Sequence, residues 1–224
     1  RRVLDTAQLL RRHDVTFNVL TVVTNDTADK LDLVYDFFAR HDLRWQQYIP
    51  CLDAFGENQG WLTVDKYAQF LCRLFDRWAE DVMQGRFIYI RQFENYLGML
   101  LGRPAESCGM MGCCGMQYTV EADGSVYPCD FYVLDAYRLG SFVTDDFDAL
   151  DEKRHALRFV EDSAEKDAEC LKCRYYPLCR GGCRRDRDDG AGHLSRTRFC
   201  SAYMKFFDYA LPRLQHIAAR CANR

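Results

Sequence analysis

The sequence predicts an α/β fold for about the first hundred residues and a smaller α+β domain for the rest. In residues 1–101, short β-branched runs alternate with stretches whose apolar residues recur at helical spacing. Such alternation is typical of parallel strands joined by crossover helices. In residues 102–224, glycines and charged loops replace the long helical patterns, and most of the chain's twelve cysteines lie there.

The composition excludes several classes of protein. The chain has 30 Lys and Arg residues and 33 Asp and Glu residues, so its formal charge is −3. This charge argues against nucleic acid or an anionic membrane as partner. No uncharged apolar run reaches the roughly 18 residues of a membrane helix. The chain starts at Arg1 with no visible signal peptide, so we expect the C-terminal part of a longer protein. Its cysteines then favour metal or redox chemistry over disulfides.

The elements of the first domain follow from the spacing of apolar residues. Residues 24–26 and Thr63 have side chains that can cap the N-terminus of a helix. Three strands are too few to close a (β/α)₈ barrel, although they could form part of one. Strands are expected at residues 17–23, 45–49 and 87–90, and helices at 3–10, 31–38, 63–78 and 93–101.

The second domain is expected to contain a β-hairpin and several helices. Tyr118–Glu121 and Ser125–Tyr127 are the predicted strands, because the Asp123-Gly124 pair between them accepts the positive φ angles of a tight turn. One or two short helices are expected within Asp146–Val160. A final amphipathic helix is expected at Cys200–Arg220, with aromatic residues on its buried side.

Eight cysteines are grouped in two sets that suit metal binding. They are enough for two four-thiolate sites, which could hold iron–sulfur clusters or structural zinc. Spacing alone neither decides between these metals nor assigns each thiol to a site. The remaining cysteines, Cys51, Cys72, Cys113 and Cys221, are interpreted as packing residues or bystanders. The two sets are Cys108-x5-Cys114-x14-Cys129 and Cys170-x2-Cys173-x5-Cys179-x3-Cys183-x16-Cys200.

The residues around these cysteines favour iron–sulfur clusters over zinc. Glycines allow backbone N–H groups to approach sulfur closely, and such hydrogen bonds tune the potential of a cluster. Arginines could offset the negative charge of thiolate-ligated clusters. The glycines are Gly109, Gly112, Gly115, Gly181 and Gly182, and the arginines are Arg180, Arg184, Arg185 and Arg187.

Two stretches of sequence are highly distinctive: DGSVYPCDFY at residues 123–132 and GGCRRDR at residues 181–187. With them, the C-terminal half resembles the SPASM domain of radical S-adenosylmethionine (SAM) enzymes, and most closely that of anaerobic sulfatase-maturating enzymes. The resemblance reaches the first domain through residues 17–24 and 47–53. It implies the C-terminal part of a partial (β/α) radical SAM barrel in residues 1–101, followed by a small α+β SPASM domain in residues 102–224.

The resemblance also implies two auxiliary [4Fe–4S] clusters. Their ligands would interleave along the chain, because Cys183 would leave its sequence neighbours to complete the first cluster. Cys113 has no place in this scheme. One cluster would be held by Cys108, Cys114, Cys129 and Cys183, and the other by Cys170, Cys173, Cys179 and Cys200.

The activity that the resemblance implies is oxidation of a cysteine or serine of a sulfatase to Cα-formylglycine, with an auxiliary cluster accepting an electron. Asp130 matches the family's base. A carboxyl group of reference pKa about 3.9 is a weak base, so we expect burial beside an anionic cluster to raise the pKa of Asp130. Leu52 falls where the family contacts the adenosine of SAM. The implied partners are the sulfatase polypeptide and a reduced electron donor such as flavodoxin or ferredoxin, in the cytoplasm.

The sequence departs from the family in one respect. It contains no C-x3-C-x2-C triplet, which binds the third [4Fe–4S] cluster, where SAM is cleaved; Cys179-x3-Cys183 begins the spacing, but Asp186 occupies the third position. We therefore expect SAM and this cluster only in the full-length enzyme, and no SAM cleavage by the chain alone. The alternatives are another SPASM enzyme that modifies peptides, a non-enzymatic zinc module that binds a protein, and, least favoured, a secreted disulfide-linked protein.

Overall fold

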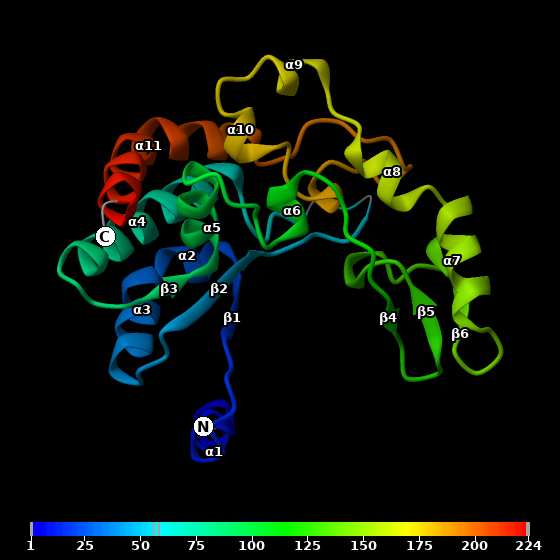
Figure 1. Cartoon of the computed structure of the whole chain (residues 1–224), viewed down its shortest axis with the longest axis horizontal. Helices are drawn as coiled ribbons and strands as arrows, with labels where there is room; N and C mark the ends of the chain where they lie inside the picture. The colour runs from blue at the N-terminus through cyan, green and yellow to red at the C-terminus, as the bar shows by residue number, and fades with distance from the viewer. Residues whose placement is uncertain (1, 56, 58, 223–224) are drawn as a thin grey trace. The chain divides into compact units, whose positions relative to one another are not determined.

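The computed structural model describes residues 2–55, 57 and 59–222. They form two compact units (Figure 1). The first unit contains the residues up to Pro104 together with those from Ser201 onwards, and the second contains Ala105–Cys200. Among the described residues, every helix falls short of the length or the apolar character that a bilayer-spanning helix requires.

A parallel three-stranded sheet forms the centre of the first unit. Strands β1 (Val19–Val23), β2 (Trp45–Pro50) and β3 (Tyr89–Ile90) lie in that order, with Thr21 opposite Tyr48. The connections between the strands run through helices, so the parallel arrangement predicted from the alternating pattern is confirmed.

Helices pack against this sheet on one face, and two of them begin where capping was predicted. Thr24 caps α2 by accepting a hydrogen bond from the backbone N–H of Thr27, and Thr63 caps α4 by accepting from that of Lys66. The helices of the first unit, of which α1 lies apart from the sheet (Figure 1), are α1 (Arg2–Arg12), α2 (Asn25–Asp29), α3 (Leu31–Arg40), α4 (Val64–Met83), α5 (Arg91–Leu100) and α11 (Cys200–Ala222).

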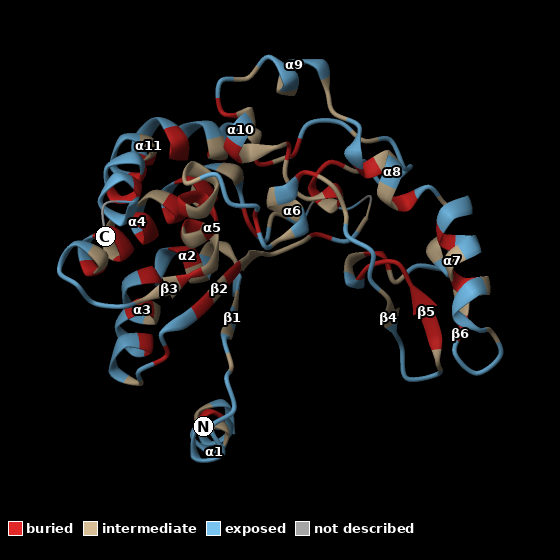
Figure 2. Cartoon of the chain, viewed as in Figure 1, coloured by how far each residue is buried: buried red, intermediate tan, exposed pale blue. Residues whose placement is uncertain are grey.

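The C-terminal helix α11 completes the core of the first unit, whereas the sequence analysis assigned it to the second domain. The Phe206 ring is fully buried, stacks on Phe93 at 5.8 Å and meets Phe75 edge-on at 5.9 Å. Phe207 packs edge-on against Tyr96 at 5.1 Å. The helical spacing of these aromatic residues predicts a buried face but does not specify which core it enters (Figure 2).

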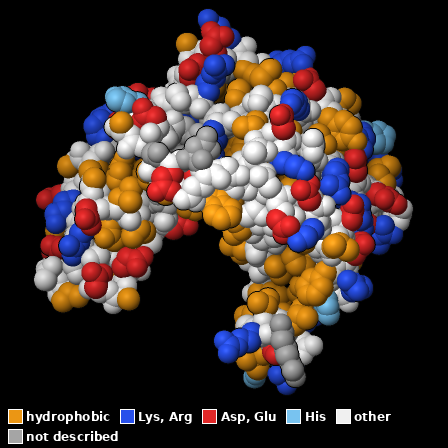
Figure 3. All heavy atoms as spheres, turned by 180° about the vertical axis from the view of Figure 1, so that it is seen from behind, with side chains coloured by type: hydrophobic (Ala, Val, Ile, Leu, Met, Phe, Trp, Pro, Cys, Tyr) orange, Lys and Arg blue, Asp and Glu red, His pale blue; other side chains and the backbone are white. Residues whose placement is uncertain are grey.

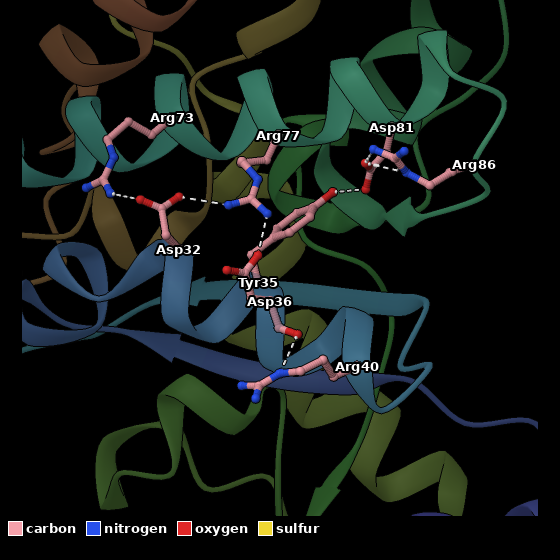
Figure 4. Close-up of polar contacts among 8 residues, drawn as sticks. All are labelled: Asp32, Tyr35, Asp36, Arg40, Arg73, Arg77, Asp81 and Arg86. Atoms are coloured by element: carbon pink, nitrogen blue, oxygen red, sulfur yellow. Dashed lines mark hydrogen bonds and ion pairs between the residues drawn. The ribbon is translucent and has the colours of Figure 1, made fainter.

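Ion pairs and a buried hydrogen bond join α3 to α4 (Figure 4). The Tyr35 hydroxyl donates to the Asp81 carboxylate at 2.7 Å, and burial raises the pKa of Tyr35. Arg77 bridges Asp32 and Asp36 at the exposed edge of the same contact. These contacts fix two neighbouring helices of the first unit, and we assign them a structural role.

The second unit is built on a small antiparallel sheet of β4 (Thr119–Val120), β5 (Ser125–Tyr127) and β6 (Gly140–Ser141). The predicted hairpin is confirmed: Val120 pairs with Val126, and Gly124 has a φ of 83° in the turn. The remaining elements are α6 (Cys108–Met111), α7 (Phe147–Ala156), α8 (Phe159–Ala164), α9 (Ala168–Leu171), α10 (Tyr176–Cys179) and the short 3₁₀ helices η1 (Asp130–Tyr132), η2 (Asp135–Tyr137) and η3 (Arg184–Asp186).

Candidate metal centres in the second unit

All eight cysteines of the predicted ligand set lie in the second unit and carry free thiols. Loop positions are expected from the sequence for the five cysteines from Cys170 to Cys200, and this is only partly correct. Cys108 begins α6, Cys170 lies in α9, Cys179 ends α10, and Cys200 begins α11. These helices, α11 excepted, are only four residues long, so they act as turns that direct a thiol.

Four thiols form a first group around Cys183, defined here as the first quartet: Cys108, Cys114, Cys129 and Cys183. Burial raises the pKa of the Cys183 thiol, and the neighbouring charges of Asp186, Cys108 and Cys114 raise it further. Burial raises the pKa of Cys129 to about 12, with a smaller contribution from Cys114. A Cβ atom on Gly109 would lie 3.4 Å from the Cβ of Cys183, so α6 packs directly against that residue.

The other four thiols form the second quartet: Cys170, Cys173, Cys179 and Cys200. Burial raises the pKa of Cys179 to about 11, and the charges of Cys200, Cys170 and Cys173 act in the same direction. The backbone N–H of Gly181 lies at the Cys179 sulfur and opposes this rise. A glycine N–H therefore approaches a thiol as the sequence analysis anticipated.

The two quartets are groups of neighbouring thiols rather than formed single-ion sites. Within residues 2–55, 57 and 59–222, no group of three or more Cys, His, Asp or Glu side chains is arranged to hold a metal ion. A four-iron cluster makes a different demand, because each thiolate binds its own iron at a separate corner of the cluster. Each quartet supplies the four thiols that such a cluster needs, and binding would displace the thiol protons.

Asp130 follows Cys129 and begins η1. The Cys129 thiol donates a hydrogen bond to the Asp130 Oδ1 atom at 3.2 Å, so the carboxylate lies directly beside a thiol of the first quartet. The expected burial of Asp130 is wrong, because its side chain is exposed in this chain.

Two arginines beside the first quartet are buried, whereas sequence analysis could not separate them from their neighbours. Arg184 and Arg187 are only 5% and 3% exposed, and the Nε atom of each is buried with no hydrogen-bond partner. The charges of both arginines oppose the rise in the pKa of Cys114 that burial causes.

Lys166 is a site neighbour that the sequence analysis missed. Its charge interacts with Cys114 of the first quartet and Cys170 of the second, as well as with Cys113. Its ammonium group donates to the carbonyl oxygen of Ser163 at 2.8 Å. A single lysine outside the cysteine motifs carries no signal that sequence reasoning could have used.

The other predicted residues lie apart from the thiol groups. Leu52 is half-buried in the segment after β2 in the first unit. Cys51 and Cys72 are partly buried, in keeping with packing roles, but Cys221 is exposed, so the interpretation of Cys221 as a packing residue is wrong.

Comparison with known families places this geometry in a class. Residues 110–174 match the SPASM family, described as an iron-sulfur cluster-binding domain. The matched range contains Cys114, Cys129, Cys170 and Cys173 and thus members of both quartets. Residues 110–174 of the second unit are therefore similar to the class of SPASM iron–sulfur domains.

The chain as a whole is similar to anaerobic sulfatase-maturating enzymes. It is 42% identical over 217 residues to the cysteine-type anaerobic sulfatase-maturating enzyme of Clostridium perfringens (strain 13 / Type A), covering 95% of this chain and 59% of the relative. Its identity to the cysteine-type enzyme of Clostridium novyi (strain NT) is 37% over 228 residues, covering 100% of this chain and 61% of the relative. A serine-type enzyme of Bacteroides thetaiotaomicron is 25% identical over 248 residues, covering 100% of this chain and 58% of the relative.

A solved structure described as native anSMEcpe with bound AdoMet and Cp18Cys peptide superposes with a TM-score of 0.88 at 41% identity, over 96% of this chain and 61% of that one. The resemblance predicted from the sequence is thereby confirmed. The chain spans 59–61% of the length of these Clostridium relatives.

Proposed function

We propose that the chain is part of an anaerobic sulfatase-maturating radical SAM enzyme that oxidises a cysteine or serine of a sulfatase to Cα-formylglycine. The observation that carries this proposal is a set of electrostatic interactions among thiols, which link Cys183 to Cys108 and Cys114, and Cys179 to Cys170, Cys173 and Cys200. The Asp130 carboxylate is hydrogen-bonded to a further thiol, that of Cys129. The first and second quartets would each hold an auxiliary [4Fe–4S] cluster. The similarity to cysteine-type anaerobic sulfatase-maturating enzymes supports the choice of a sulfatase as substrate.

The chemistry divides between the bound groups and this chain's residues. When bound, SAM would supply the radical that removes a hydrogen atom from the substrate Cβ, and the auxiliary clusters would supply an acceptor for the one electron that the resulting substrate radical must lose. Asp130 then accepts the proton from the substrate sulfur or oxygen, leaving a thioaldehyde, which water converts to the aldehyde with release of hydrogen sulfide, or the aldehyde directly. Because Asp130 is exposed in this chain, a covering substrate would be needed to withdraw it from water and strengthen it as a base.

The first unit would be the C-terminal part of a partial (β/α) barrel. On β1, Leu20 and Val22 point to one face of the sheet and are 58% and 54% exposed. Parallel sheets in proteins are covered on both faces, so further chain is expected on this one. Hydrophobic side chains gather beside the N-terminal segment in the space-filling view (Figure 3). SAM and a third [4Fe–4S] cluster would be bound only in the full-length enzyme, with Leu52 contacting the adenosine.

The partners that follow from this function are a sulfatase polypeptide and a reduced electron donor such as flavodoxin or ferredoxin. A peptide is bound in the solved structure described above, which supports a polypeptide substrate. Cluster chemistry of this kind favours a cytoplasmic, oxygen-poor setting.

The test uses the protein extended to the length of its curated relatives, incubated anaerobically with SAM, a reductant and a sulfatase-motif peptide. The aldehyde product is trapped with a hydrazine and identified by mass spectrometry. We expect Asp130→Asn to lower the rate by about 10²-fold or more, which is the usual contribution of a general base. The matched control is Asp135→Asn, since Asp135 is also exposed and begins the next 3₁₀ helix. Full activity of the Asp130→Asn protein would remove Asp130 from the mechanism, and absence of aldehyde with every variant would favour another SPASM reaction.

A further inference from the structure

Two buried arginines flank the first quartet and are held without a carboxylate partner. Arg184 donates from Nη1 to the carbonyl oxygen of Phe159 at 2.7 Å. Arg187 donates from Nη1 to the carbonyl oxygen of Glu165 at 2.7 Å and from Nη2 to that of Ser163 at 2.5 Å. Carbonyl oxygens fix the guanidinium groups but do not cancel their charge, so two positive charges remain buried here.

Aromatic rings hold Arg184 in place. Its guanidinium carbon lies 4.4 Å from the centre of the Phe159 ring and 5.5 Å from that of Tyr132. Tyr132 and Phe159 are almost completely buried and pack edge-on against each other at 4.9 Å. The charge of Arg184 is therefore positioned rigidly and is not free to turn towards solvent.

Among the residues that the structure describes, none accepts a hydrogen bond from the buried Nε atom of either arginine. An unsatisfied buried N–H is costly, and native proteins retain one where a further group completes its bonding or uses its charge. Both arginines interact electrostatically with Cys114, and Arg187 interacts with Cys183 as well. The unsatisfied donors therefore lie beside the thiols that would hold the first cluster.

The acidic groups near these arginines offset their charge only in part, although Asp186 itself acts on Cys183 in the opposite direction. Asp186 is 8% exposed and its carboxylate is paired with Arg198 at 3.2 Å. Asp188 accepts the hydrogen bond of the Tyr132 hydroxyl at 2.8 Å. Asp130 is exposed, so water screens its charge.

The second quartet has a different electrostatic environment. From outside the quartet, the charges of Asp167 and Arg196 act on Cys170 with opposite signs, and Arg196 is exposed. Lys166 interacts with a cysteine of each quartet, so it does not distinguish them.

We propose that Arg184 and Arg187 raise the reduction potential of the cluster held by the first quartet above that of the cluster held by the second. One-electron reduction adds a negative charge to a group that is already anionic, and buried positive charges stabilise the reduced form more than the oxidised form. Both are positioning residues, since they act on the cluster without ligating it. This inference rests on the proposed cluster binding.

The test is a redox titration of the anaerobically reconstituted chain, with dithionite as reductant and EPR as readout. A double variant, Cys170→Ala/Cys173→Ala, should lack the second cluster, so its EPR signal identifies the signal of the first cluster. We expect Arg187→Gln to lower the ratio of reduced to oxidised first cluster at a fixed applied potential at least tenfold. This corresponds to a shift of the reduction potential of the first cluster by ~59 mV to a more negative value. The second cluster should keep its potential. Arg138→Gln is the control, because Arg138 is an exposed arginine of the same unit.

Each outcome bears on the inference. An unchanged first potential in both Arg184→Gln and Arg187→Gln proteins, or equal shifts of both clusters, would overturn it. If the glutamine variants assemble less iron, their potential is read from the clusters that do assemble, and the Arg184→Lys and Arg187→Lys proteins are titrated beside them. A wild-type potential with lysine together with a shifted potential with glutamine would support a role of charge, whereas a tenfold shift with lysine would overturn it. Failure of the wild-type chain to bind iron would instead refute the proposed function.

Discussion

Replacing Cys183 by alanine should remove the first cluster and leave the second, although Cys183 stands in the sequence between Cys179 and Cys200. In the structure, a Cβ atom added to Gly109 would lie 3.4 Å from the Cβ of Cys183, and the charges of Cys108 and Cys114 act on Cys183. Because each cluster contains four irons, iron should fall from about eight towards about four per chain.

Paired substitutions test more stringently which cysteines share a cluster. Cys108→Ala/Cys183→Ala should lose no more iron than Cys183→Ala alone, since both residues would serve one cluster. Cys179→Ala/Cys183→Ala should lose both clusters. Iron and sulfide are measured after anaerobic reconstitution, with EPR of the dithionite-reduced protein to count the remaining clusters. The opposite pattern, in which the Cys179/Cys183 pair behaves as a single substitution and the Cys108/Cys183 pair abolishes iron binding, would refute the interleaved assignment.

Three further predictions concern the fold, pH and SAM. Phe206→Ala should lower the free energy of unfolding of the first unit by ~3–5 kcal/mol, measured by urea denaturation with tryptophan fluorescence, while Met204→Ala, at an exposed position, should cost less than about 0.5 kcal/mol. The metal-free second unit should lose stability as pH rises from 9 to about 12, because burial raises the pKa of Cys129 and Cys179 and favours their protonated forms. The chain alone, with SAM and dithionite, should form no 5′-deoxyadenosine by chromatography.

Each of these has a clear contrary result. A loss below about 1 kcal/mol in Phe206→Ala protein would mean that α11 is not part of the first core. Unchanged urea stability of the metal-free protein between pH 9 and 12, or an equal loss after Cys129→Ser/Cys179→Ser substitution, would contradict the role of the buried thiols. Formation of 5′-deoxyadenosine would show that the C-x3-C-x2-C triplet is not required.

Local signals in the sequence were sufficient for most of the secondary structure. Thr24 and Thr63 cap helices as predicted, and the Asp123-Gly124 turn forms the hairpin. These features depend on residues close together in the chain, so their spacing carries the information.

Features that depend on distant residues were harder to predict. The aromatic face of α11 was recognised, but its place against Phe75 and Phe93 in the first unit was not, because hydrophobic periodicity does not name a partner. The sequence pattern also does not predict which arginines of one charged stretch are buried. Arg184 and Arg187 are buried, while Arg180 and Arg185 are only partly buried. Exposure of Asp130 has the same origin, since a carboxylate after a buried cysteine can point either way.

The central claim is that this chain assembles two four-iron clusters from eight thiols. Mössbauer spectroscopy of the anaerobically reconstituted protein, combined with sulfide and zinc analysis, tests it most directly. The account predicts about eight irons per chain, all in [4Fe–4S] clusters, with an equal amount of sulfide. Colourless protein that carries two zinc ions and no sulfide, or protein whose cysteines are paired as disulfides under anaerobic conditions, would contradict it.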